Sequence, residues 1–123
     1  MRIRSFIIPV VFLAFGAIFT ACGGGDGETN GDGLPACPSG GTDLTYASFG
    51  EAFFSTHCTS CHAAGTGVAG AESDPFETQA QIQAAIEDIY ERAGGTNDSM
   101  PPSGGPTAEE RQQLAEWLSC GAE

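Results

Sequence analysis

The stretch HCTSCHAAG, residues 57–65, contains two cysteines three residues apart and a histidine directly after the second. Cys58, Cys61 and His62 form the pattern C-x-x-C-H. Four kinds of chemistry use closely spaced cysteines in this way: a zinc site, a structural disulfide, a redox-active dithiol and the covalent attachment of a haem. The choice among them depends on what the rest of the chain supplies.

The spacing of the motif favours haem attachment. Residues three apart share a face of a helical turn, so the sulfurs of Cys58 and Cys61 can form thioethers with the two vinyl groups on one porphyrin edge. His62 then lies under the iron as its proximal ligand. A zinc site would need two ligands from Cys37, Cys120 and His62. A redox dithiol expects a βαβ pattern, which the sequence lacks, and a disulfide between Cys58 and Cys61 is the simplest alternative.

The N-terminus has the pattern of an export signal over residues 1–21. Arg2 and Arg4 form a short basic region, and an almost unbroken apolar run follows over residues 6–19. A membrane-spanning helix needs about 20 apolar residues, so this run predicts a cleaved signal peptide rather than a permanent anchor.

Cys22 follows the signal directly, after Phe19-Thr20-Ala21. This arrangement resembles the lipobox of bacterial lipoproteins, which implies that Cys22 receives a lipid and anchors the exported chain to the periplasmic or cell-envelope face of a bacterial membrane. The alternative is an ordinary signal peptide with Cys22 left as a thiol. Residues 22–36 are rich in glycine and are expected to form a flexible tether, which leaves residues 37–123 as the folded domain.

The charge of the chain is strongly acidic. It has 16 aspartates and glutamates against 4 arginines and no lysine, and removal of the signal would leave only Arg92 and Arg111. An acidic surface repels nucleic acid and anionic lipid headgroups. A protein partner is therefore expected to present a basic or uncharged docking patch, although the acidity could also serve solubility alone.

The hydrophobic pattern predicts an all-α domain with about three helices. The first is expected over residues 46–56, capped by Thr45, although Gly50 in its middle costs about 1 kcal/mol relative to alanine. The last is expected from the capping box of Thr107 and Glu110 to about residue 119.

A middle helix is expected to begin at Asp74-Pro75-Phe76-Glu77, residues 74–77. This segment offers a capping residue, a proline at the first helical position and an acidic residue in the first turn. Apolar residues then follow at helical spacing until Gly94-Gly95: Ile82, Ile86, Ile89 and Tyr90.

Over residues 46–121 the chain resembles a class I c-type cytochrome. The resemblance rests on the C-x-x-C-H motif, on Gly50 and Phe54 before it, on Met100-Pro101-Pro102 and on the apolar and aromatic residues of the last helix, Leu114, Trp117 and Leu118. It implies a small fold of helices and loops around one covalent haem c, with Gly50 allowing the first and last helices to cross closely. It also implies an electron carrier rather than an enzyme, working with redox partner proteins.

Met100 is the expected distal iron ligand. It lies in a loop rich in glycine and proline, and it would be the only methionine left after signal removal. A thioether is a soft neutral ligand suited to haem iron. An iron with both axial positions filled favours electron transfer. The alternatives are a haem-based sensor with a labile distal position and a binding module without haem that is held together by zinc or a disulfide. The resemblance also implies that a downstream proline carbonyl accepts the ring N–H of His62, and Pro75 is the only proline between His62 and Met100, although it is also used to begin the middle helix.

Two further cysteines and one histidine complete the candidate residues. With Cys22 assigned to lipid and the motif cysteines to haem, Cys37 and Cys120 remain as one pair, and an exported chain favours a disulfide between them over two free thiols. His57 precedes the motif, on the wrong side to bind the iron, and is expected to be solvated.

Overall fold

The computed structural model describes residues 33–123. The predicted signal peptide of residues 1–21, the lipidation site Cys22 and most of the predicted tether therefore lie outside the described residues. No helix within residues 33–123 has the length and hydrophobicity needed to cross a bilayer.

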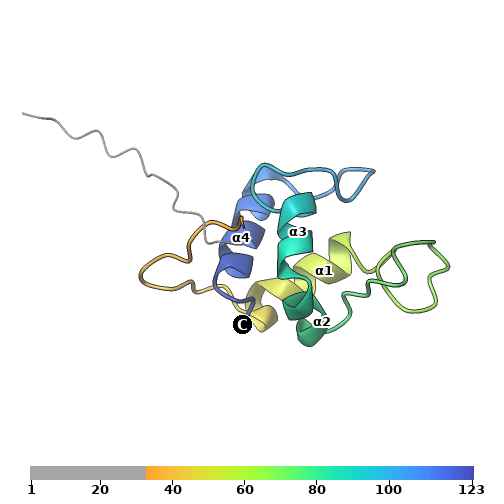
Figure 1. Cartoon of the computed structure of the whole chain (residues 1–123), viewed down its shortest axis with the longest axis horizontal. Coiled ribbons are helices and arrows are strands. Elements are labelled where there is room, and N and C mark those ends of the chain that lie inside the picture. The colour runs from red at the N-terminus through yellow and green to blue at the C-terminus, as the bar shows by residue number, and fades with distance from the viewer. Residues whose placement is uncertain (1–32) are drawn as a thin grey trace, which may run out of the picture.

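The described part of the chain consists of helices and loops, with no β-strand among residues 33–123, and confirms the all-α prediction. A π-helical turn η1 (Tyr46–Gly50) continues into α1 (Glu51–His57), and α2 (Gln79–Ala84), α3 (Ile86–Ala93) and α4 (Ala108–Ser119) follow. Figure 1 shows α3 beside α4, and the segment between α1 and α2 as a long loop that projects away from the helices.

The first and last helices cross at Gly50, as the resemblance implies. A Cβ atom at Gly50 would lie 2.6 Å from Cη2 and 2.8 Å from Cζ2 of Trp117. Such an approach is too close for any side chain, so only glycine permits this crossing. The helix-propensity cost of Gly50 is therefore offset by the packing of a fully buried tryptophan.

The middle helix begins later than the sequence predicts. α2 starts at Gln79, and Thr78 is its N-cap: the Thr78 hydroxyl accepts from the Gln81 N–H, and the Gln81 side chain accepts from the Thr78 N–H. The expected start at residues 74–77 is wrong, because this segment turns back toward the C-x-x-C-H motif instead of entering the helix. The helical run also breaks at Ala85, which separates α2 from α3.

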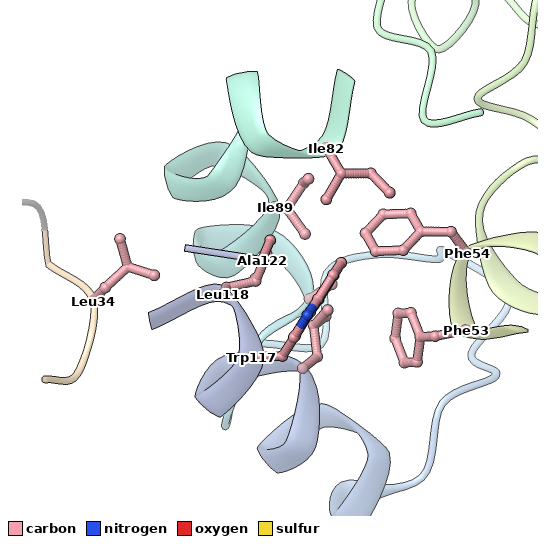
Figure 2. Packing of buried hydrophobic residues seen from close by; sticks show 10 residues of the cluster. Leu34, Phe53, Phe54, Ile82, Ile89, Trp117, Leu118 and Ala122 are labelled. Carbon is pink, nitrogen blue, oxygen red and sulfur yellow. The ribbon is translucent and has the colours of Figure 1, made fainter. Parts of the chain in front are cut away.

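The last helix agrees with the prediction. Thr107 and Glu110 form the expected capping box, and α4 ends at Ser119. Its buried face carries Trp117, and Figure 2 shows this ring next to Phe53 and Phe54 of α1, with Ile82 of α2 and Ile89 of α3 above it. The buried indole N–H donates to the backbone carbonyl of Glu123 at 3.1 Å, so burial leaves no polar atom of Trp117 unpaired.

The folded domain extends further toward the N-terminus than residue 37. Leu34, which the sequence assigns to the tether, is only 5% exposed and belongs to the core cluster. In Figure 2 its side chain points toward Leu118 and Ala122. Cys37 follows and forms a disulfide with Cys120, across a sequence separation of 83 residues. The N-terminal segment of the described chain is therefore attached to the end of α4 by both packing and a covalent bond.

Candidate haem site

The C-x-x-C-H motif forms a continuous series of turns at the end of α1. The N–H of Cys58 donates to the Phe54 carbonyl at 2.9 Å, and the N–H groups of Cys61 and His62 both donate to the Cys58 carbonyl, at 3.1 and 2.8 Å. Cys58 and Cys61 are half-buried free thiols. The backbone therefore wraps tightly enough to bring the two cysteines and the histidine to one local site.

Burial raises the pKa of the Cys58 thiol to about 12, although the nearby Arg111 charge lowers it somewhat. The thiol is therefore protonated at neutral pH. A redox-active dithiol depends on a thiolate stabilised by a lowered pKa. The environment of Cys58 has the opposite effect and does not fit that chemistry.

The ring of His62 is held in one tautomer and one orientation. Its Nδ1 lies 2.9 Å from the backbone carbonyl oxygen of Asp74. A carbonyl can only accept, so Nδ1 donates to it and Nε2 is the ring nitrogen left for a metal. Phe76 stacks on the ring, with centroids 4.6 Å apart and planes inclined by 22°. His62 thus presents a pre-oriented ring nitrogen of the kind that binds metals.

The acceptor for the His62 ring, which the sequence left open, is the backbone carbonyl of the residue before Pro75. The carbonyl of Asp74, not of Pro75, faces the ring, and the N–H of Phe76 returns a hydrogen bond to the His62 carbonyl at 2.9 Å. Residues 74–76 are therefore engaged with His62, which is why they do not begin α2. The Glu77 carboxylate also accepts from the Ala64 N–H at 3.1 Å and closes the base of the projecting loop.

Met100 lies in the loop between α3 and α4. It is partly buried and packs against the same apolar cluster as Cys58. Its N–H donates to the Arg92 carbonyl at 2.9 Å, and its carbonyl accepts from the guanidinium of Arg111 at 2.9 Å. The backbone on both sides of the thioether is therefore fixed.

These residues fit a covalent haem. The residues offer two free thiols, one imidazole nitrogen without a protein partner and one thioether, which is the chemistry that haem attachment and axial ligation require. Partly buried apolar side chains that could cover a porphyrin, Phe76, Ile86 and Tyr90, pack on the same cluster as Cys58 and Met100.

The two other arrangements of the cysteines do not fit this geometry. Cys37 and Cys120 are joined to each other, so neither can complete a zinc site with the motif. Within residues 33–123 no group of three or more histidine, cysteine, aspartate or glutamate side chains is placed to hold a metal ion. Cys58 and Cys61 are not bonded to each other.

His57 is not solvated, contrary to the prediction. Its side chain is 14% exposed, with Nε2 3.6 Å from Glu110 Oε1 and its ring 5.1 Å from that of Phe53. The backbone N–H of Thr107 donates to the Glu110 carboxylate and lowers its pKa, and His57 lowers it further. His57 thus links the end of α1 to the start of α4, away from the His62 ring.

Motif analysis does not identify two groups of the site, the Asp74 carbonyl and the Arg111 side chain. The Asp74 carbonyl has no side-chain signal, because any residue could supply it. Arg111 is 6% exposed and carries a signal that is visible in retrospect: it lies three residues before Leu114 on the face of α4 that carries the buried residues. A charged residue on that face predicts a buried ion with several hydrogen-bond partners.

Comparison with known families gives one match. The family described as cytochrome c oxidase, cbb3-type, subunit III matches residues 47–118, which is more than half of the 123-residue chain. Comparison with curated proteins and with solved structures gives no match. The matched range includes the whole C-x-x-C-H motif, Met100 and most of α4. The chain therefore belongs to this family, and it is a class I c-type cytochrome with a covalently bound haem c that functions in electron transfer.

Proposed function

We propose that the chain is a single-haem electron carrier in which Cys58 and Cys61 hold the haem by thioethers and His62 and Met100 bind its iron from opposite sides. The observation that carries the proposal is the 2.9 Å contact between His62 Nδ1 and the Asp74 carbonyl, which leaves Nε2 available. The bound haem supplies an iron that alternates between ferric and ferrous states. The protein side chains hold that iron and complete its coordination.

The two axial residues explain why electron transfer is favoured over chemistry on a bound ligand. A nitrogen of His62 and the sulfur of Met100 leave no open coordination position for oxygen or substrate. The His62 ring is held by the Asp74 carbonyl and the Met100 backbone N–H by the Arg92 carbonyl, so neither group has to move when the iron changes charge. A sensor would instead need a distal ligand that is easily displaced.

Replacing Met100 by alanine tests this proposal. The haem should stay attached through Cys58 and Cys61, but the methionine-to-iron absorption band should disappear and the reduction potential should fall, because the thioether favours ferrous iron. Carbon monoxide should bind the reduced variant readily. Optical spectra and a potentiometric titration measure all three effects.

The control for this test is the exposed Ser103 of the same loop. Ser103→Ala should retain the wild-type spectrum and exclude carbon monoxide. A wild-type protein that already binds carbon monoxide would favour the sensor. An unchanged spectrum in Met100→Ala would remove Met100 from the iron.

The redox partner is proposed to dock through a basic or uncharged patch. Arg111 is buried, so Arg92 is the only exposed arginine or lysine among residues 33–123, against acidic side chains on α1, α3 and α4. This charge repels acidic partners and nucleic acid. Electron donor and acceptor proteins with basic docking surfaces would associate faster at low ionic strength.

The cytochrome is further proposed to be an exported lipoprotein, anchored through Cys22 at the periplasmic or cell-envelope face of a bacterial membrane. Residues 1–21 supply the signal pattern, and no helix of residues 33–123 spans a membrane. Lipid on Cys22, followed by a glycine-rich tether, would keep the haem domain close to membrane-bound redox partners.

Cys22→Ser tests the anchor. The wild-type protein should partition into detergent and incorporate labelled fatty acid, whereas the variant should lose the label and either keep its signal peptide or become soluble. Thr29→Ala, a substitution within the predicted tether, should behave as wild type. Identical partitioning and labelling of Cys22→Ser would contradict lipidation at this residue.

A further inference from the structure

Arg111 is the buried charged residue of the described core. It lies in the second turn of α4 and is only 6% exposed. One of its nitrogens, Nη1, lies within hydrogen-bond distance of three backbone carbonyls: Met100 at 2.9 Å, Asn97 at 3.0 Å and Ala93 at 3.1 Å. These carbonyls belong to the end of α3 and to the loop that carries Met100.

The guanidinium has no carboxylate partner among the described residues. Within residues 33–123 the Glu110 carboxylate lies near His57, and the side-chain hydrogen bonds of Arg111 go to backbone carbonyls alone. A charge buried without a counter-ion is costly unless its hydrogen bonds are retained. Opening the loop at Met100 would remove one of them, so the cost of burying Arg111 opposes any movement of this loop.

The remaining contacts of the loop attach it mainly to α3. The Met100 N–H donates to the Arg92 carbonyl at 2.9 Å, and the Asn97 side chain donates to the Tyr90 carbonyl at 2.9 Å. The hydrogen bonds that join the loop to α4 within the described residues involve Arg111. Its guanidinium donates to loop carbonyls, and its own carbonyl accepts from the Gly95 N–H at 2.8 Å. Arg111 therefore fixes the loop that carries Met100 relative to the last helix.

We propose that Arg111 is a positioning residue for the distal ligand: its guanidinium holds the Met100 backbone so that the thioether stays on the iron. This inference rests on the proposed axial role of Met100. The same charge also reaches the haem-attachment segment, since it acts electrostatically on Cys58. A planar guanidinium extends further than an ammonium and presents more donors, so lysine should replace it only in part.

Competition by free imidazole for ferric iron tests the proposal in the purified holoprotein, because imidazole binds only when Met100 leaves. Arg111→Met should raise the affinity for imidazole by at least about tenfold, the factor that corresponds to losing one charge-assisted hydrogen bond. The methionine-to-iron band should weaken in parallel. Arg111→Lys should lie between the wild type and Arg111→Met in both measurements.

Two control variants separate positioning from other effects. Gln112→Met changes the exposed residue next to Arg111 on α4 and should leave imidazole affinity unchanged. Leu34→Ala removes a buried side chain at the opposite end of α4 and should lower the melting temperature without changing imidazole affinity. If the Arg111 variants differ from the wild type no more than Leu34→Ala does, the residue is merely structural and the inference is wrong.

The outcomes also distinguish this inference from the proposed ligation. A wild-type protein without the methionine-to-iron band would overturn the role of Met100 and the positioning role with it. A wild-type protein with the band, whose Arg111 variants keep it at full strength and bind imidazole normally, would overturn only the role of Arg111. Should Arg111→Met fail to yield holoprotein, Arg111→Lys carries the test, and wild-type affinity in that variant would contradict the proposal.

Discussion

Replacement of His62 by alanine is expected to abolish the low-spin haem spectrum and most of the folded protein. The substitution removes the proposed proximal nitrogen together with the hydrogen bond to the Asp74 carbonyl and the stacking partner of Phe76. Partly buried apolar side chains of the cluster that includes Cys58, among them Ile86, would lose the proposed cofactor as a packing partner. Small domains have a net stability of only about 5–15 kcal/mol, so loss of the haem should unfold most of the protein.

Haem staining, optical spectra and circular dichroism of the variant measure this loss. His57→Ala is the matched control, since it removes the neighbouring imidazole on the side that faces Glu110. It should keep a low-spin spectrum and the wild-type haem content. A stable low-spin holoprotein from His62→Ala would show that another residue binds the iron.

The second large effect concerns the disulfide. Replacing both Cys37 and Cys120 by serine opens a loop defined by a sequence separation of 83 residues. In the chain-entropy model, closing a loop of this length stabilises the folded state by about 4 kcal/mol, and measured values are often smaller. For a domain of this size that is a large share of the free energy of unfolding.

Denaturant unfolding of the holoprotein measures the change. The midpoint of the double variant should fall well below that of the wild type, and adding a reductant to the wild type should reproduce the fall. Cys22→Ser lies outside the disulfide and should leave the midpoint unchanged. Mass spectrometry of a non-reduced digest should recover the two cysteine peptides joined; equal midpoints, or alkylation of both thiols without reductant, would contradict the disulfide.

Local signals were sufficient for the helices whose ends depend on nearby residues. Thr45 and Thr107 cap the first and last helices as the sequence predicts, because a capping box is satisfied within four residues. The cost of Gly50 could be interpreted only with the resemblance to cytochromes, since the reason is the indole ring of Trp117 on another helix.

Tertiary contacts decide the features that the sequence did not predict. The middle helix is expected to start at Asp74, but α2 begins after Thr78. The hydrogen bond from the His62 ring decides this later start, since it holds the Asp74 carbonyl outside the helix. The burial of Arg111 likewise depends on acceptors from a separate loop, and that of Leu34 on the end of α4.

The position of the disulfide has a mechanical consequence. All four haem-site residues, from Cys58 to Met100, lie between Cys37 and Cys120 in the chain. A pull on the N-terminal side of Cys37 therefore passes through the sulfur bridge to the end of α4 and bypasses the enclosed segment. Tension between the two chain ends would leave residues 38–119 unloaded. A pulling force on a cytochrome anchored at its N-terminus would therefore not be transmitted to the residues proposed to bind its iron.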